Sequence, residues 1–202
     1  MLKELFEAHF YSVYPKKKNK VLMLNERTAI NDFSLIDPNA CSRCRYICHN
    51  VPEKREQLRI HSNNNIYIIS FDEVFSYVSK DVGEICDYML ENNDTTTMVE
   101  MTCSTSNNVI GKRQKARSQL YNTLRLLYLH PVIKKHIENH SMRYVVFSWK
   151  ETRPKEQNMD NVELTMKGMT VLTDAVYSPD NESPFSFDFK LKEIRYPDRL
   201  NC

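Results

Sequence analysis

One tight turn constrains the fold of this chain more than any other feature of its sequence. The turn, Asn92-Asn93-Asp94-Thr95, separates two strand-like segments, 84–91 and 96–103. Short polar residues of this kind favour a two-residue loop between antiparallel strands. With Asn93-Asp94 as that loop, the sequence predicts three opposed pairs in the hairpin: Leu90 with Thr97, Tyr88 with Val99, and Asp87 with Glu100.

In this register Asp87 and Glu100 project from the same face of the hairpin, because side chains alternate between the two faces of a strand. Two carboxylates opposite each other lie about 5 Å apart and repel. A divalent cation between them removes that repulsion. Mg²⁺ prefers one or two carboxylates together with water and substrate phosphate, which suits a site that hydrolyses phosphodiesters. The alternative is a solvent-exposed face with lysine or arginine side chains nearby.

Hydrophobic spacing elsewhere predicts alternating helices and strands. We expect helices at 2–13, 72–79, 111–129 and 131–140. We expect strands at 21–24, 66–70, 142–149, 171–177 and 185–196, with the last two forming an antiparallel pair. We expect irregular chain at 37–65, where the asparagines at 63–65 indicate a turn, and a polar loop at 151–168.

This order of elements is typical of an α/β protein with a central mixed sheet flanked by helices. With 202 residues, the chain fits a single domain over 1–202. Within it we expect three parts: a core at 66–150, a cysteine-containing segment at 37–65 and a β-rich tail at 151–202.

Three short motifs follow one another around the hairpin: EICDYML at 84–90, VEMT at 99–102 and ARSQL at 116–120. Together they resemble the core of the PD-(D/E)XK nucleases. In that family a leading helix precedes a hairpin that carries Asp and then Glu-x-Lys, and a helix then crosses the sheet to another strand. The resemblance covers about residues 66–150 and implies a restriction-endonuclease-like core.

The resemblance also implies roles for particular residues. Asp87 and Glu100 take the places of the carboxylates that bind Mg²⁺ or Mn²⁺, with the Met101 carbonyl as a further ligand. Gln119 matches a helix position that faces the site and orients water or substrate. An acidic residue of the leading helix completes the set in the family, and the candidates for it are Glu4, Glu7 and Glu73.

The chain departs from the family at one position. Thr102 stands where the motif has lysine, two residues after Glu100. Lysine there stabilises charge on the attacking water and the phosphate, and neutral threonine cannot. Two readings stay open: Lys112 or Lys115 of the following helix supplies the positive charge, or the site is inactive and the fold serves as a binding module.

Basic residues crowd the start of that helix, at Lys112, Arg113, Lys115 and Arg117. Positive charge is unfavourable near the N-terminus of a helix, so the cluster indicates contact with a phosphate backbone. The alternative is a merely solvated face. The formal net charge of +2 means that any nucleic-acid surface must be local.

A cysteine cluster is the second metal-like pattern. It comprises Cys41, Cys44, Cys48 and His49, with His61 as another potential ligand. Cys-x₂-Cys is half of a typical zinc site, so structural Zn²⁺ is one reading. An iron–sulfur cluster and three ordinary thiols are the others. His136 and His140 share a helix face, where we expect a solvated helix end and no metal.

Other sequence features exclude several classes. The three glycines, Gly83, Gly111 and Gly168, are not clustered as a P-loop, a dinucleotide fingerprint or a kinase loop requires. The first ten residues, MLKELFEAHF, lack an apolar core of signal-peptide length, and the longest apolar runs are too short to span a bilayer. We therefore expect a cytoplasmic protein with reduced thiols and no membrane partner.

Three functional hypotheses follow. The first is a metal-dependent nuclease that hydrolyses phosphodiester bonds in DNA or RNA, with restriction or defence as roles suggested by analogy. The second is a catalytically inactive module of the same fold that binds nucleic acid or a partner protein. The third is a zinc-stabilised interaction protein. The resemblance also makes a homodimer or a partner subunit an expectation.

Overall fold

The computed structural model describes residues 2–14, 16–17, 22, 24–36, 46–48, 56–79, 81–104, 109–151 and 182–202. Its helical segments are α1 (Leu2–Leu5), the π-helical η1 (Phe6–Phe10), α2 (Tyr11–Val13), α3 (Phe71–Ser76), α4 (Val109–Tyr128), α5 (Pro131–Glu138) and the 3₁₀ turn η3 (Ser186–Asp188). Its strands are β1 (Arg27–Leu35), β2 (Tyr46–Cys48), β3 (Leu58–Ser70), β4 (Tyr88–Glu91), β5 (Thr95–Ser104), β6 (Met142–Glu151), β7 (Glu182–Pro184), β8 (Lys190–Arg195) and β9 (Arg199–Asn201).

The described strands form one nine-stranded mixed sheet. Its order is β2-β1-β3-β4-β5-β6-β8-β7, and β9 adds to β3. Neighbours from β1 to β5 pair antiparallel, whereas β5, β6 and β8 run parallel to one another. The α4–α5 crossover joins β5 to β6, as a parallel connection requires. The expected α/β fold with a central mixed sheet and flanking helices is confirmed.

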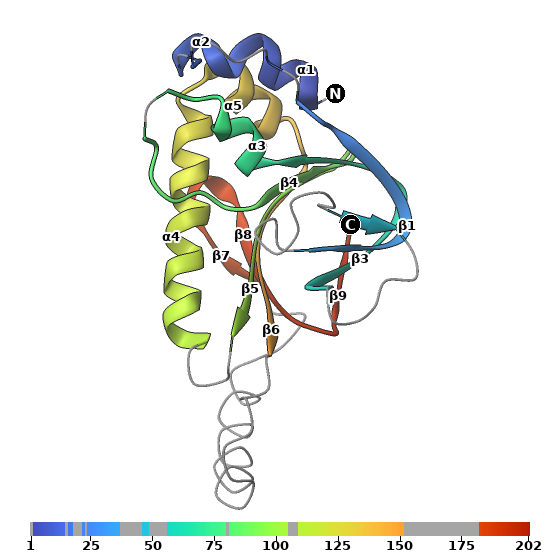
Figure 1. Ribbon diagram of the computed structural model, residues 1–202. Coiled ribbons are helices and arrows are strands. Elements are labelled where there is room, and N and C mark those ends of the chain that lie inside the picture. The colour runs from blue at the N-terminus through green and yellow to red at the C-terminus, as the bar shows by residue number, and fades with distance from the viewer. Residues whose placement is uncertain are drawn as a thin grey trace, which may run out of the picture.

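The helices bury one face of this sheet. On α4, Leu120, Leu124 and Leu127 recur at helical spacing and are fully buried. They belong to a core that also contains Met89 of β4 and Met98 of β5, together with residues of α5, α3 and the N-terminal helix. Figure 1 shows α4 along one side of the sheet, with α1, α2, α3 and α5 gathered at one end.

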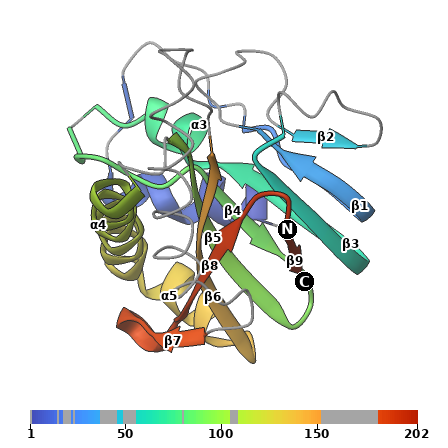
Figure 2. The same cartoon turned by 90° about the horizontal axis from the view of Figure 1, so that it is seen from below.

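The strands β1, β3 and β9 curl over the opposite face and close a second core. In both views β1 lies on the other side of β5 from α4 (Figures 1 and 2). The first half of β3 pairs with β9 and the second half with β4, so β3 belongs to both parts of the curled sheet. Tyr88, Val99 and Val146 pack there against Ile60 and Leu200.

Two expectations for the N-terminal half are wrong. β3 runs through 58–65, where irregular chain is expected, because β1 pairs with it on both sides of the asparagines, at 58–62 and 66–68. The asparagines at 63–65 do not end the strand. The pairing with β1 shifts there instead: Ala29 pairs with Ile66 and Asn31 with Ser62, so the asparagines form a bulge in β3 opposite Ile30, next to Asn31 with its φ of 63°. Leu22 and Leu24, within the expected strand 21–24, lie outside the described strands, and fully buried Leu24 packs in the helical core.

The remaining elements agree with expectation to within a few residues. The helices over 2–13, 72–79, 111–129 and 131–140 are confirmed, as is the strand 142–149. In the tail, β8 occupies the second half of the expected strand 185–196, the 3₁₀ turn η3 lies in its first half, and the described antiparallel partner of β8 is β7. The expected strand 171–177 and loop 151–168 lie outside the described residues, apart from Glu151 at the end of β6.

Within the part of the chain that is described, no helix has both the length and the apolar character needed to cross a bilayer.

Candidate active site

The hairpin between β4 and β5 has the predicted register from Tyr88 onward, but the predicted pairing of Asp87 with Glu100 is wrong. Tyr88 pairs with Val99 and Leu90 with Thr97. The turn closes through Asn92, whose backbone N–H donates to the Thr95 carbonyl at 3.0 Å. The Asn92 side-chain oxygen also accepts from the backbone N–H groups of Asp94 and Thr95, which stabilises the turn locally.

The chain departs from regular pairing just before β4, at Asp87. Its backbone N–H donates to the Val99 carbonyl at 3.0 Å, so Asp87 and Tyr88 both oppose Val99, as in a β-bulge. The Asp87 carboxylate accepts from the Met101 N–H at 2.8 Å. Because the N–H and carbonyl of one strand residue point to the same side, the Met101 carbonyl is also directed toward Asp87.

Asp87 and Glu100 line one cavity of about 320 Å³ between the hairpin and the first turns of α4. They are 8% and 7% exposed, which rules out the alternative of a solvent-exposed acidic face. The cavity contains four carboxylates and two lysines, from Asp72, Glu84, Asp87, Glu100, Lys112 and Lys115. Its remaining lining comes from Gly83, Ile85, Met101, Thr102, Ala116, Gln119 and Phe147. This excess of carboxylate oxygen fits a hard divalent cation such as Mg²⁺ or Mn²⁺.

The basic residues of α4 separate into different environments. Lys112 and Lys115 line the cavity. Lys115 contacts Glu84 at 2.7 Å, and this hydrogen bond and charge, with a smaller effect of Glu100, raise the pKa of its ammonium group. Arg113 instead pairs with Glu193 of β8 at 2.7 Å, and Arg117 is exposed. Lys112 and Lys115 therefore bring positive charge to the cavity that contains Thr102.

Side chains of α4 hold the segment that leads into Asp87. Gln119 Nε2 donates to the Ile85 carbonyl at 3.0 Å, so this amide group positions the backbone beside the carboxylates. Asn122 Nδ2 lies 2.9 Å from the carbonyls of both Val82 and Glu84. Between these two residues the chain bends at Gly83, whose φ of 77° is a conformation that glycine adopts readily.

Cys86, next to Asp87, does not act as a nucleophile. Its side chain is fully buried, and burial raises the pKa of the thiol well above its ordinary value. The hydrogen bond with Thr123 opposes that shift, and the negative charges of Glu100 and Asp87 reinforce it. The thiol stays protonated at neutral pH, so it contributes packing rather than chemistry.

The acidic residue that α3 contributes to the cavity differs from those expected. Asp72, in the first turn of α3, lines it, whereas the expectation named its neighbour Glu73 on the same helix. Glu7 and Glu73 accept hydrogen bonds from the backbone N–H groups of Leu24 and Asn25, respectively. Glu4 is exposed on α1 and does not line the cavity.

The expected cysteine site falls mostly on undescribed chain. Cys41, Cys44 and His49 lie outside the described residues, and of Cys48 only the backbone is described, in β2. His61 contacts Asp32, with 2.9 Å between Nδ1 and Oδ1. Zinc binding by this segment stays a prediction.

No family model, no curated protein and no solved structure matches the chain.

Proposed function

We propose that this protein is a cytoplasmic, metal-dependent nuclease that hydrolyses phosphodiester bonds in DNA or RNA. One observation carries the proposal: Asp87 and Glu100 line the same cavity together with two lysines. Paired carboxylates bind the cations that phosphodiester hydrolysis uses, and lysine stabilises the charge that develops on phosphate.

The order of elements supports the same proposal. An antiparallel hairpin carries the two acids, α4 crosses over, and β6 returns parallel to β5. The PD-(D/E)XK core, which the sequence motifs resemble, has this order. Asp72 of α3 supplies the acidic residue that the family takes from its leading helix.

Each group has a chemical role in this proposal. Asp87, Glu100 and the Met101 carbonyl would hold Mg²⁺ or Mn²⁺, which when bound lowers the pKa of water and neutralises phosphate charge. Lys115 and Lys112 lie in the same cavity and take the role of the motif lysine, whose position is occupied by Thr102. Gln119 holds the 85–87 backbone so that Asp87 keeps its position.

The direct test is cleavage of plasmid, single-stranded DNA and RNA in Mg²⁺ or Mn²⁺. We expect Asp87→Asn and Glu100→Gln to lower the rate at least about 100-fold, because each removes a charged metal ligand. Lys115→Ala should lower it by about 100-fold or more through loss of charge stabilisation. Glu138→Gln is the matched control, because Glu138 is exposed on α5, pairs with Lys134 and does not line the cavity, so its change should leave the rate unaltered. Equal rates for the parent and the two carboxylate variants would contradict the proposal.

A second candidate is an inactive module that binds nucleic acid, favoured by Thr102, which is half-buried at the cavity. Thr102→Lys restores the motif lysine and separates the two candidates. If the parent binds DNA or RNA without cleaving it and Thr102→Lys cleaves, the natural site is a degenerate binding site. If the parent already cleaves, the motif lysine is not required for activity and the second candidate is excluded.

A further inference from the structure

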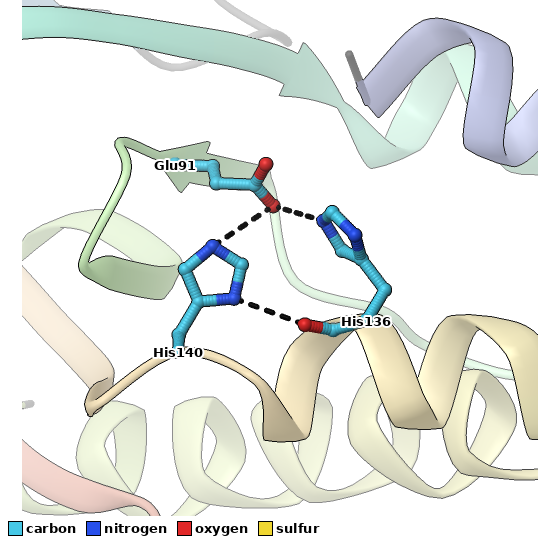
Figure 3. Close-up of side chains that lie close together, drawn as sticks. All are labelled: Glu91, His136 and His140. Carbon is cyan, nitrogen blue, oxygen red and sulfur yellow. Dashed lines mark hydrogen bonds and ion pairs between the residues drawn. The ribbon is translucent and has the colours of Figure 1, made fainter.

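A second cluster of metal-ligating side chains lies at the end of β4 away from the cavity, on the face of the sheet that the helices cover. It consists of Glu91, His136 and His140, whose potential ligand atoms all lie within 4.8 Å of one another (Figure 3). The two histidines come from α5 and the residues just after it, at i and i+4. Glu91 follows Asp87 by four residues, about 13 Å along a strand, so this cluster is separate from the cavity.

The cluster is more buried than its sequence position indicated. His140 and Glu91 are 8% and 7% exposed, and the side chain of His136 is 30% exposed. The expectation of a solvated helix end is therefore wrong for His140, because the β4–β5 hairpin covers the end of α5. One side of the cluster remains open through His136.

The orientation of His140 is the strongest indication of a cation. Its Nδ1 lies 3.1 Å from the His136 carbonyl, an acceptor, so Nδ1 carries hydrogen. In the neutral ring Nε2 then presents a lone pair, and it faces Glu91 Oε2 at 3.7 Å. Two lone pairs facing each other repel unless a proton or a metal ion lies between them. A backbone acceptor on the second ring nitrogen is also how metal-binding histidines are oriented in proteins.

His136 presents its own Nε2 to the same carboxylate oxygen, at 2.7 Å. That is a hydrogen-bond distance, shorter than the roughly 3.3 Å that separates two ligands of a tetrahedral ion at metal–ligand distances of about 2.0 Å. If a metal ion takes the place of the proton in this hydrogen bond, the partly exposed His136 ring has to move outward only slightly.

We propose that Glu91, His136 and His140 bind a divalent transition-metal ion of the Zn²⁺ class. Two imidazoles favour Zn²⁺ and its neighbours over Mg²⁺, which favours oxygen ligands. Three protein ligands with an open side leave a coordination position for water or an external ligand, as in catalytic rather than structural zinc sites.

The test measures Zn²⁺ bound per chain after removal of metal and dialysis against Zn²⁺ with a competing chelator. We expect Glu91→Gln, His136→Asn and His140→Asn each to bind one Zn²⁺ fewer per chain than the parent, with affinity at this site reduced at least about 100-fold. His9→Asn is the matched control, because His9 lies on the N-terminal helix outside the cluster. A urea unfolding curve for each variant establishes that it is folded.

Two further measurements distinguish a metal ion bound by this cluster from one bound elsewhere on the chain. Co²⁺ bound to thiolates gives intense near-ultraviolet absorption, whereas a His–Glu set does not, so a metal held by the cysteine segment is recognised in the same samples. The double variant Asp87→Asn/Glu100→Gln should retain the ion bound by the cluster, so failure of the nuclease proposal would leave this one intact. Equal Zn²⁺ content in the parent and all three cluster variants overturns the inference.

Discussion

At the scale of single residues, His130 is a titratable side chain buried among aromatic rings. It is 2% exposed, and its ring lies against those of Phe10 and Tyr14, at 5.3 and 5.4 Å between centroids. Its Nε2 has no hydrogen-bond partner among the described residues. Burial, with a smaller effect of nearby His9, lowers the pKa of His130 below its ordinary 6.5. The folded protein therefore favours the neutral form of this buried imidazole.

This burial predicts acid sensitivity. As pH falls below 6.5, the unfolded chain takes up a proton at His130 before the folded chain does, so stability is lost until the folded pKa is passed. The loss is about 1.4 kcal/mol for each unit by which the two pKa values differ. We expect His130→Phe to reduce the loss of unfolding free energy between pH 7 and pH 5, measured by urea unfolding. A parent-like slope in His130→Phe would refute the prediction.

At the scale of elements, α4 does more than cover the sheet, because its polar side chains hold the irregular chain that precedes β4. Thr123 is fully buried, donates to the Gln119 carbonyl and accepts from the Cys86 N–H, both at 2.9 Å. Gln119 and Asn122 bind neighbouring carbonyls of the same segment. A helix thereby supplies the hydrogen bonds that a neighbouring strand would otherwise provide, and Asp87 is placed as a result.

We expect Thr123→Val to destabilise the protein by about 1–3 kcal/mol, because it leaves the buried Cys86 N–H without an acceptor. Urea unfolding measures the loss. Thr123→Ser keeps the hydroxyl and separates this effect from lost packing. Hydrogen exchange at the Cys86 amide should accelerate in the valine variant and stay slow in the serine variant; equal exchange in both would show that the hydroxyl is not the cause.

At the scale of the whole molecule, the curled sheet is closed by chain far apart in sequence. β9 pairs in parallel with the first half of β3, and the Cys202 N–H donates to the His61 carbonyl at 3.0 Å. Figure 2 shows β9 beside β3, on the side of the sheet away from α4. Leu200, 2% exposed, fills the second core with residues of β1 and β3. The second core therefore depends on β9, a strand far from β1 and β3 in the sequence.

Leu200→Ala should lower the free energy of unfolding by about 2–5 kcal/mol, since it removes a buried side chain and leaves a cavity. Asn201→Ala, next to it on the exposed side of β9, should change stability by no more than about 0.5 kcal/mol. Urea unfolding of both variants tests whether β9 belongs to the cooperative core. A Leu200→Ala variant as stable as the control would mean that the strand adds to the fold without stabilising it.

Local chemistry in the sequence was enough to determine the β4–β5 hairpin and the four helical regions. The Asn92-Asn93-Asp94-Thr95 turn sets its own register, and the apolar spacing of α4 needs only a helix to produce a buried stripe. Tertiary structure decided what depends on partners distant in sequence. β3 continues past three asparagines because β1 pairs with it on both sides of them, Asp72 enters the cavity because α3 begins there, and Glu91 meets His136 and His140 because the hairpin covers α5. Pairing between strands distant in sequence and convergence of side chains from separate elements are properties of non-local contacts, which no local pattern specifies.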